Sequence, residues 1–459
     1  MEAMSIEEIR KAVGGKIVQG NPSEYIDSIS IDSRKIEPGE LFIAIIGENY
    51  DAHTFIPDAV NKGAGGLIVD RSIKAYPGVA VIRVKDTTEA LQDLAAYNRR
   101  RYEDLEIIGI TGSVGKTTTK DMIASIFSEK EDTLKTEGNY NNYYGLPLTL
   151  LSLKGNEKFA VLEMAMSKLG EISKLAEIAA PRIGVVTNVG PAHLKSLKNV
   201  ANVAKAKEEL IKALPEDGTP VLNYDNKYTR KMNEAFRGKK IVYYGLDENA
   251  DYYATDIKTN EEEKNISFTV ITPNNKVKLK LNKPGEHNIY NALAAIAVAR
   301  IHEISWDKIK IGLNNLNLSS LRLDIRELKE LTIINDTYNA NPLSMRAGIN
   351  VLKDIAKKRK IAVLGDMLEL GPEEEQAHYE LGKLIVNKNI DILITVGVLS
   401  KIIASGAKDN GFEKNNIYQC QSNKEVADIL QTITQKGDTI LLKGSRKMKM
   451  EDILKLLQD

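Results

Sequence analysis

The chain has 459 residues, which leaves room for about three domains of ordinary size. Lysine and arginine together number 63, as do aspartate and glutamate, so the sequence lacks the basic excess expected of a general nucleic-acid binder. The single cysteine, Cys420, excludes an intrachain disulfide framework and a cysteine-based zinc site. An acidic start and short apolar runs predict a cytoplasmic protein with no membrane insertion.

The first stretch of the chain, residues 1–85, predicts a small α/β domain. Its β-rich pieces lie at residues 28–32, 40–46 and 66–70, and residues 55–62 have a helical pattern. Residues 86–101 place apolar side chains on one helical face, so we interpret them as the connector into the next domain.

The second stretch, residues 86–318, predicts a doubly wound central domain. Apolar strands between helices indicate a largely parallel sheet covered on both faces. The strands are expected at residues 106–110, 159–162, 183–187 and 221–224, and the helices at 116–129, 169–178, 200–214 and 288–301. A β-hairpin is expected from the alternation in residues 266–271 and 276–281.

The third stretch, residues 319–459, repeats the rhythm of strand and helix and predicts a Rossmann-like domain. Its strands are expected at residues 331–335, 360–364, 390–396 and 439–442. The predicted fold class is therefore α/β with three domains.

A phosphate-binding loop is predicted at Gly112-Ser-Val-Gly-Lys-Thr117, between an apolar strand and a helix. Glycines let backbone N–H groups surround phosphate oxygens, and the helix N-terminus adds its positive end. Lys116 can reach the phosphates, and the Thr117 hydroxyl can ligate Mg²⁺. The spacing is the short form G-x-x-G-K-T, so an ordinary strand-to-helix turn is the alternative.

Other candidate ligands follow predicted strands or lie on helices. Glu163 ends a strand beside the loop and is either a metal ligand or an exposed carboxylate. His193 is a ligand or a hydrogen-bonded loop histidine, and the composition around Lys207 favours a solvated helix face.

Two further segments carry amide or carboxylate groups. His287 and Asn291 share one face of a predicted helix, where amides could bind an adenine edge, whereas Asn288 could simply cap the helix. Asp336 follows a strand and could bond a ribose hydroxyl or form an Asx-turn before the helix that begins near Pro342.

These segments, in this order, resemble the Mur ligase family, which builds the peptide stem of bacterial cell-wall precursors. The resemblance covers nearly the whole chain and is strongest to the type that adds D-alanyl-D-alanine. It rests on Asp32-Ser-Arg34, Thr111-Gly-Ser-Val-Gly-Lys-Thr117, Glu137-Gly-Asn-Tyr-Asn-Asn142, Thr187-Asn-Val-Gly-Pro-Ala-His193, Ala204-Lys-Ala-Lys207, Gly285-Glu-His-Asn288, Asn335-Asp-Thr-Tyr-Asn-Ala-Asn341, Leu364-Gly-Asp-Met-Leu-Glu369 and Lys443-Gly-Ser-Arg446.

The resemblance implies an ATP-dependent ligase that joins D-alanyl-D-alanine to UDP-N-acetylmuramoyl-tripeptide through an acyl phosphate. It implies a first domain that binds the UDP end of the substrate, a central domain that binds ATP and Mg²⁺, and a third domain that closes over the site. Because the family is mostly monomeric, a monomer is expected.

The resemblance also assigns roles to residues. Lys116, Lys207, His193 and Arg322 would serve catalysis, with Lys207 carbamylated. Magnesium would be held by Thr117, Glu163, His193 and Lys207. The nucleotide would be bound by Gly112, Ser113, Gly115, Lys116, Thr117, Thr118, His287, Asn288, Asn291, Arg322 and Asp336. The UDP-linked substrate would be bound by Ser33, Arg34, Asn139, Asn141 and Asn142.

Three alternatives remain at this stage. The nearest is the Mur ligase type that adds the third amino acid, although its Asp-Asn-Pro-Arg segment is missing here. Folylpolyglutamate synthases share the nucleotide core but not this first domain. A nucleotide-binding module without ligase activity is the alternative from another class.

Overall fold

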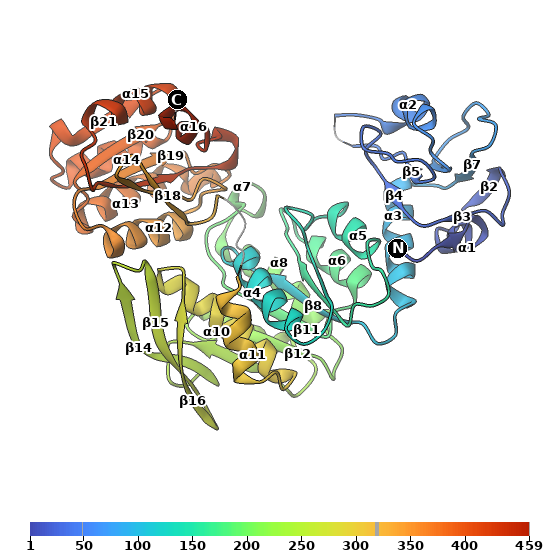
Figure 1. The fold of residues 1–459 in the computed structure, drawn as a ribbon, viewed down its shortest axis with the longest axis horizontal. Helices are drawn as coiled ribbons and strands as arrows, with labels where there is room; N and C mark the ends of the chain where they lie inside the picture. The colour runs from blue at the N-terminus through green and yellow to red at the C-terminus, as the bar shows by residue number, and fades with distance from the viewer. Residues whose placement is uncertain (48, 317–320, 459) are drawn as a thin grey trace.

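The computed structural model describes residues 1–47, 49–316 and 321–458. Within these ranges the chain forms three lobes in sequence order, and the first and third lie on opposite sides of the middle one (Figure 1). The expected boundary between the second and third domains, at residues 318 and 319, lies outside the described residues.

The first lobe is built around a sheet in the order β2-β7-β6-β5-β4, parallel except for the antiparallel strand β2. Its elements are β1 (Met4–Ser5), α1 (Ile6–Ala12), β2 (Lys16–Gln19), β3 (Tyr25–Ile26), β4 (Ile29–Ser30), β5 (Leu41–Ile43), η1 (Ala52–Phe55), α2 (Ile56–Asn61), β6 (Gly66–Val69) and β7 (Ala80–Arg83). Helix α2 covers one face of the sheet, where Ile56 packs with Phe42 and Leu67.

The middle lobe contains a sheet in the order β16-β15-β14-β13-β12-β11-β8-β10-β9. Its elements are α3 (Thr87–Arg100), β8 (Glu106–Thr111), α4 (Lys116–Ser128), β9 (Thr133–Lys135), α5 (Gly145–Leu150), β10 (Phe159–Glu163), α6 (Glu171–Ala179), β11 (Ile183–Val186), α7 (Leu194–Leu197), α8 (Val200–Lys212), β12 (Thr219–Asn223), α9 (Lys227–Arg230), η2 (Lys231–Ala235), β13 (Val242–Gly245), β14 (Tyr252–Asn260), β15 (Asn265–Thr272), β16 (Asn275–Leu281), α10 (Glu286–Ile301) and α11 (Trp306–Asn314).

Helix α3 joins the first lobe to the middle one, as the sequence predicts. It begins at Thr87 because the carboxylate of Asp86 accepts hydrogen bonds from the first free backbone N–H groups. Its buried face places Leu91 and Leu94 in a hydrophobic cluster shared with Leu146 of the middle lobe.

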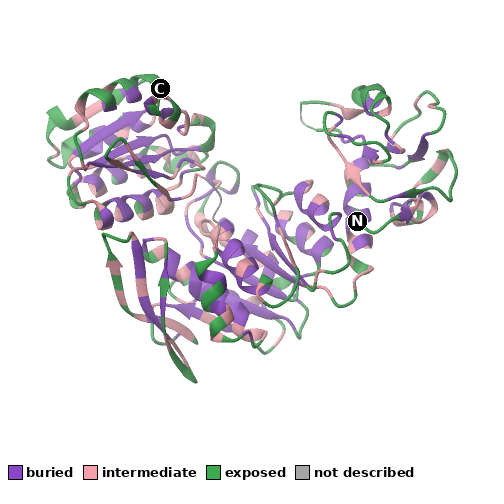
Figure 2. Ribbon diagram, in the orientation of Figure 1, coloured by how far each residue is buried: buried purple, intermediate pink, exposed green. Residues whose placement is uncertain are grey.

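The strand order places the ligand side of the middle sheet at the end of β8. Strands β8 to β13 are parallel, and β8 lies between β10 and β11. The chain passes from β8 to β9 and β10 on one side and then crosses to β11, β12 and β13 on the other side. In open parallel sheets such a reversal leaves a crevice at the carboxyl ends of the strands, where ligands bind. Strands β8, β10, β11 and β12 are apolar because helices cover both faces of the sheet, and Figure 2 colours nearly all of their residues buried.

The third lobe contains a sheet in the order β17-β18-β22-β19-β20-β21, parallel apart from the edge strand β17. Its elements are β17 (Asp324–Leu328), β18 (Leu331–Asn335), α12 (Pro342–Ile355), β19 (Lys360–Gly365), η3 (Gly371–Glu373), α13 (Glu374–Asn387), β20 (Ile392–Val396), α14 (Ser400–Asp409), η4 (Lys414–Asn416), β21 (Ile417–Cys420), α15 (Asn423–Ile433), β22 (Thr439–Lys443), η5 (Arg446–Met448) and α16 (Asp452–Gln458). Helices cover both faces of this sheet (Figure 1).

The predicted α/β class is confirmed, including the parallel central sheet and the antiparallel hairpin formed by β15 and β16. Some predicted boundaries were wrong. The strand expected over residues 40–46 ends at Ile43, and the helix expected from residue 169 begins at Glu171, after Gly170 in a left-handed conformation. In the described part of the chain no helix is both long and apolar enough to cross a membrane.

Candidate active site

The phosphate loop runs from the end of β8 to the first turn of α4, as predicted. The segment that follows β11 holds it in place. The backbone N–H of Ser113 donates to the carbonyl of Asn188 (3.1 Å), and that of Val114 donates to Asn188 Oδ1 (3.0 Å). The Thr187 hydroxyl donates to the Val114 carbonyl at 2.6 Å. These bonds fix the backbone, so the loop can present N–H groups to an anion beside the N-terminus of α4.

Two glycines in this loop cannot be replaced without displacing a neighbour. Gly115 has φ of 85°, and a Cβ there would lie 2.4 Å from Asn291 Oδ1. A Cβ on Gly112 would lie 1.8 Å from Thr187 Oγ1. Both glycines therefore serve close backbone approach, the geometry that a phosphate loop requires.

The Lys116 side chain folds back over the loop, and its Nζ donates to the Gly112 carbonyl at 2.9 Å. Burial lowers the pKa of Lys116; the nearby carboxylate of Glu163 opposes this shift, and the charge of Arg322 adds to it. The two influences place Glu163 and Arg322 in the electrostatic surroundings of the lysine, although Arg322 belongs to the third lobe.

Glu163 is buried at the end of β10, so its interpretation as an exposed strand-end carboxylate is wrong. Its Oε2 accepts a hydrogen bond from the Thr117 hydroxyl (2.8 Å), and its Oε1 accepts one from Asn141 Nδ2 (2.9 Å). Its backbone N–H donates to Thr136 Oγ1 at 3.0 Å. A carboxylate and a hydroxyl thus meet beside Lys116, and both are oxygen ligands of the kind that Mg²⁺ takes.

Lys207 lies on α8 and is only 3% exposed, which corrects the interpretation of its helix face as solvated. Burial lowers its pKa well below the usual value, and the charge of Lys116 lowers it further. Within the described ranges, its ammonium forms no salt bridge. Buried lysines are usually paired, so this side chain requires a chemical explanation.

His193 precedes α7 with φ of 53°, in the left-handed region that few residues other than glycine adopt. Its Nδ1 lies 2.9 Å from Glu369 Oε2 of the third lobe. Burial lowers its pKa; Glu369 opposes the shift, whereas Lys116 and Lys207 reinforce it. The hydrogen-bonded loop histidine is therefore observed, and its ring lies in the same electrostatic neighbourhood as the two lysines.

The predicted nucleotide residues of α10 form a buried chain of amides behind the loop. Asn291 Oδ1 accepts from the Thr119 hydroxyl, and its Nδ2 donates to Asn288 Oδ1, both at 3.3 Å. Asn288 donates in turn to the carbonyl of Pro284 at 2.9 Å. Asn288 is not the helix cap, because that position belongs to Gly285.

His287, the residue before Asn288, lies close to charged residues of the third lobe. Burial lowers the pKa of His287 to about 4, and the charges that act on it are those of Asp336 and Lys443. Asp336 follows β18, and its Oδ2 accepts from the buried Lys443 Nζ at 2.5 Å. Arg322 stacks on Tyr338, 3.9 Å from the ring centroid. Residues predicted for one nucleotide site thus come from two lobes.

The third lobe contacts the phosphate loop directly. Asn341 Nδ2 donates to the Ser113 carbonyl at 3.3 Å, and the backbone N–H of Lys195 donates to the Glu369 carbonyl at 3.1 Å. Asn341 also caps α12, which begins at Pro342 as expected. The loop, His193 and the strand ends of the third lobe therefore form one region.

The predicted substrate residues are not all gathered there. Asn141 reaches Glu163, whereas Asn139 is exposed and Asn142 turns its side-chain oxygen to the N–H groups of Tyr144 and Gly145. Ser33 and Arg34 lie in the first lobe, and no hydrogen bond or ion pair joins them to the middle lobe in the described part of the chain. Arg34 pairs with Asp32 instead, which lowers the pKa of that carboxyl to about 2.

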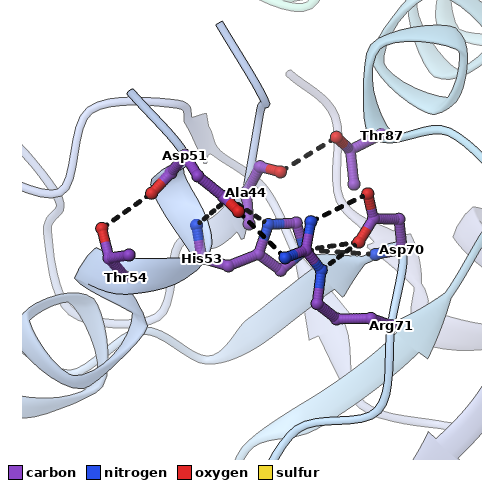
Figure 3. Close-up of polar contacts among 7 residues, drawn as sticks. All are labelled: Ala44, Asp51, His53, Thr54, Asp70, Arg71 and Thr87. Atoms are coloured by element: carbon purple, nitrogen blue, oxygen red, sulfur yellow. Dashed lines mark hydrogen bonds and ion pairs between the residues drawn. The ribbon is translucent and has the colours of Figure 1, made fainter. Parts of the chain in front are cut away.

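A polar cluster in the first lobe links the loops that follow β5 and β6 (Figure 3). His53 lies between two carboxylates, with Nδ1 2.7 Å from Asp51 Oδ1 and Nε2 3.2 Å from Asp70 Oδ1. Arg71 pairs with the same carboxylates, at 2.9 Å from Asp51 and 2.7 Å from Asp70. The cluster holds the carboxyl ends of neighbouring strands together, on the ligand side of this sheet.

Neither a ready-made cluster of metal ligands nor a large cavity marks the predicted magnesium site in the described part of the chain. No three His, Cys, Asp or Glu side chains gather into a metal-binding group among residues 1–47, 49–316 and 321–458. A cavity of about 680 Å³ lies along the second half of α4 and β9, and phosphate-loop residues do not line it. Mg²⁺ commonly takes one or two carboxylates with phosphates and water, so the Thr117–Glu163 pair is compatible with it.

Sequence reasoning missed several residues that hold this region together. Asn188 and Glu369 lie inside motifs that the sequence analysis quotes, so their place in those motifs was an available signal. Lys120 and Thr136, which anchor the strand end beside Glu163, carry no such signal, because a lysine on a charged helix and a threonine after a strand are common on surfaces.

The chain is similar to proteins of known family along its whole length. Residues 25–99 match the description "Mur ligase family, catalytic domain", residues 110–299 "Mur ligase middle domain" and residues 321–446 "Mur ligase, glutamate ligase domain". The UDP-N-acetylmuramoyl-tripeptide–D-alanyl-D-alanine ligase of Bacillus subtilis (strain 168) is 38% identical over 98% of this chain and 97% of its own length.

Solved structures agree with this similarity. MurF from Acinetobacter baumannii superposes with a TM-score of 0.93 at 32% identity, over 100% of this chain and 99% of its own. MurF ligase from Thermotoga maritima, in complex with ADP, superposes with a TM-score of 0.84 at 29% identity, over 94% and 97% of the two chains. With its phosphate loop, its strand-end carboxylate and its third lobe arranged as described, the chain belongs to the Mur ligase family.

Proposed function

We propose that this chain is the ATP-dependent ligase that joins D-alanyl-D-alanine to UDP-N-acetylmuramoyl-tripeptide in peptidoglycan precursor synthesis. The observation that carries the proposal is the buried Thr117–Glu163 pair beside Lys116, at the mouth of a phosphate loop. The printed names of the full-length relatives supply the substrates, and the ADP complex of a related MurF ligase supports the nucleotide.

The reaction takes two steps. The terminal carboxylate of the tripeptide attacks the γ-phosphorus of ATP, so an acyl phosphate forms and ADP leaves. The amine of D-alanyl-D-alanine then attacks the acyl carbon, an amide bond forms, and phosphate leaves as the amine loses a proton. Phosphoryl transfer needs positioning and charge neutralisation more than covalent help, and the loop N–H groups with Lys116 and Arg322 supply both.

Magnesium fits the donors that are present. Thr117, Glu163, His193 and Lys207 would hold it. When bound, magnesium neutralises charge on the phosphate oxygens and holds them in line. The hydrogen bonds of Thr117 and Asn141 keep the Glu163 carboxylate turned toward the loop, so the oxygens are arranged before the ion arrives.

Lys207 is suited to carbamylation. Burial and the charge of Lys116 lower the pKa of Lys207, which favours the neutral amine, the form that can add to CO₂ with loss of a proton. The product is an anion, which would relieve the repulsion between Lys207 and Lys116 and offer an oxygen ligand to magnesium. The lack of a carboxylate partner for Lys207 in the described residues supports this assignment.

The remaining site residues follow the same scheme. Gly112, Ser113, Gly115, Thr118 and Arg322 would contact the phosphates. His287, Asn288, Asn291 and Asp336 would bind adenosine. Ser33, Arg34, Asn139, Asn141 and Asn142 would bind the UDP-linked peptide. The three functional domains would be residues 1–85, 86–318 and 319–459, in a monomer that works in the cytoplasm.

Phosphate release tests the proposal directly. Turnover should require ATP, the UDP-linked tripeptide and D-alanyl-D-alanine together, and Lys116→Ala should abolish it because the phosphates lose their cation. Supplying the UDP-linked dipeptide with a diamino acid tests the neighbouring Mur ligase activity in the same assay. Nucleotide binding with no turnover on either substrate pair would instead support a binding module and overturn the proposal.

A further inference from the structure

A second lysine on the phosphate helix has a defined task that the proposed chemistry does not use. Lys120 lies one helical turn after Lys116 and is only 3% exposed. Its Nζ donates to the carbonyl of Thr136 at 2.6 Å and lies 3.1 Å from Asp121 Oδ1. Lysine is rarely buried to this extent unless its charge is paired and its N–H groups are used, and both conditions hold here.

The partner of Lys120 is the strand end that supports the candidate metal ligand. Thr136 directly follows β9, and its hydroxyl accepts the backbone N–H of Glu163 at 3.0 Å. Its own N–H donates to the carbonyl of Val161 at 3.1 Å. Thr136 is thus bonded to α4 through Lys120 and to β10 through Glu163 and Val161.

The loop that follows Thr136 returns to the same carboxylate. Asn141 Nδ2 donates to Glu163 Oε1, and the Asn141 carbonyl accepts the backbone N–H of Ala165 at 2.9 Å. The Thr117 hydroxyl, on the same helix as Lys120, holds the other oxygen of Glu163. Helix α4 therefore reaches Glu163 by two routes, directly through Thr117 and indirectly through Lys120 and Thr136.

We propose that Lys120 is a positioning residue that sets the distance between the phosphate helix and Glu163, and so tunes how the enzyme binds magnesium with its nucleotide. The inference rests on the proposed function of the same site. A lysine suits this position because its ammonium both pairs with the buried Asp121 carboxylate and donates to the Thr136 carbonyl. An apolar side chain would leave the carbonyl without this donor and free the strand end to shift.

Lys135 provides a matched control. It pairs with the same Asp121 oxygen at 3.2 Å, but its side chain is 33% exposed and it has no hydrogen bond to Thr136. Lys120→Met and Lys135→Met remove the same charge from the same carboxylate. Only the first also removes the donor to the strand end.

The experiment measures ATP binding by calorimetry over a range of Mg²⁺ concentrations, together with steady-state turnover. Loss of a group that hydrogen-bonds a metal ligand changes metal affinity or activity by about 10- to 100-fold. Because Lys120 acts on Glu163 through Thr136, we expect Lys120→Met to raise the Mg²⁺ concentration at half-saturation and to lower kcat by about 10-fold, the lower end of that range. ATP binding without Mg²⁺ should be unchanged in Lys120→Met, and Lys135→Met should match the wild type in all three measurements.

A second variant covers the case in which Lys120→Met does not fold. Thr136→Val keeps the carbonyl that Lys120 binds and removes only the hydroxyl that accepts from Glu163, so it should shift the Mg²⁺ dependence in the same direction. Where both variants fold, their double variant should show less than the sum of the two effects, because both act through one strand end.

Three results would overturn the inference. Folded Lys120→Met or folded Thr136→Val could show the wild-type Mg²⁺ concentration at half-saturation. Alternatively, Lys135→Met could shift that concentration as far as Lys120→Met does. Failure of the proposed function has a different signature. The wild-type chain would then show no Mg²⁺-dependent ATP binding, or no turnover with the two substrates.

Discussion

Replacing Lys207 by methionine should make the protein more stable and inactive at the same time. The side chain is buried on α8, its pKa is lowered by burial and by Lys116, and no ion pair compensates its charge in the described part of the chain. Methionine has nearly the same length and flexibility and carries no charge. The variant therefore removes an electrostatic penalty while it keeps the packing of the helix.

Proton linkage determines how the stability of the wild-type protein changes with pH. Because the folded pKa of Lys207 is lowered, the unfolded chain binds more protons between the folded pKa and the ordinary value near 10.5, and wild-type stability rises with pH across that window. The penalty is fully present below the folded pKa and disappears as pH passes the unfolded pKa. The stability advantage of Lys207→Met should therefore be greatest below the folded pKa of Lys207 and should shrink as the pH rises toward 10.5.

The gain in the free energy of unfolding of Lys207→Met should be a few kcal/mol at most. Replacing buried ion pairs by apolar residues of similar volume often stabilises proteins by about 1–4 kcal/mol, and we expect a gain within the same range for the single buried amine of Lys207. For a unit of the size of the middle lobe, each kcal/mol raises the melting temperature by about 2–4 °C. The same variant should show no turnover, because the proposed carbamate cannot form.

Calorimetric melting of the ligand-free protein at several pH values measures the effect. Lys205→Met is the control, since Lys205 is exposed on the same helix two residues away. We expect Lys205→Met to melt with the wild type at every pH. A lower melting temperature in Lys207→Met, or an advantage that grows with pH, would refute the view that Lys207 is an uncompensated buried amine.

Three shorter predictions concern the same region. Glu163→Gln should lose most phosphate release and destabilise the ligand-free protein by about 1–3 kcal/mol in denaturant titration, because its amide end cannot accept one of the two bonds now donated by Thr117 and Asn141. Gly115→Ala should abolish calorimetric ATP binding, since its φ of 85° alone costs about 1–2 kcal/mol and its Cβ would displace a neighbouring amide. Glu369→Gln should lower the pKa of His193 further, because the charge that opposes the shift is gone; an unchanged histidine NMR titration would contradict this.

Features set by local sequence were predicted well. The strand at residues 331–335 matches β18 because it is apolar and is followed by the turn residues Asn335 to Asn341. The strand, glycine-containing loop and helix over residues 106–128 follow from the apolar residues and the glycines of that segment, whereas phosphate binding by the loop stays a prediction. Boundary errors arose where backbone conformation decides the end of an element. The strand expected from residue 390 begins at Ile392, after Asn389 in a left-handed turn.

Burial of charged side chains could not be predicted, because it depends on which helix face meets a sheet. Lys205 and Lys207 lie two residues apart on α8, yet Lys205 is exposed whereas Lys207 is buried, with 3% of its surface exposed. Lys120 is hidden on α4 for the same reason, since that helix packs against β9 and β10. Sequence patterns treat such lysines alike, and only the resemblance to a family singled out Lys207.

The charge balance of the site explains why the whole-chain composition was uninformative about its ligands. The net charge of the chain is zero, but the charge of Lys116 lowers the pKa of both Lys207 and His193, and the charge of Lys207 also lowers the pKa of His193. The Glu163 carboxylate opposes the lowering of the Lys116 pKa. Folding has therefore gathered mutually repelling cations in a buried place, and this arrangement is stabilised most by a ligand that brings negative charge. A polyphosphate and a peptide carboxylate supply that charge. Repulsion between these positive charges destabilises the ligand-free site, and the bound anions remove that repulsion. Part of the binding energy of the substrates is therefore used to bring the catalytic groups together.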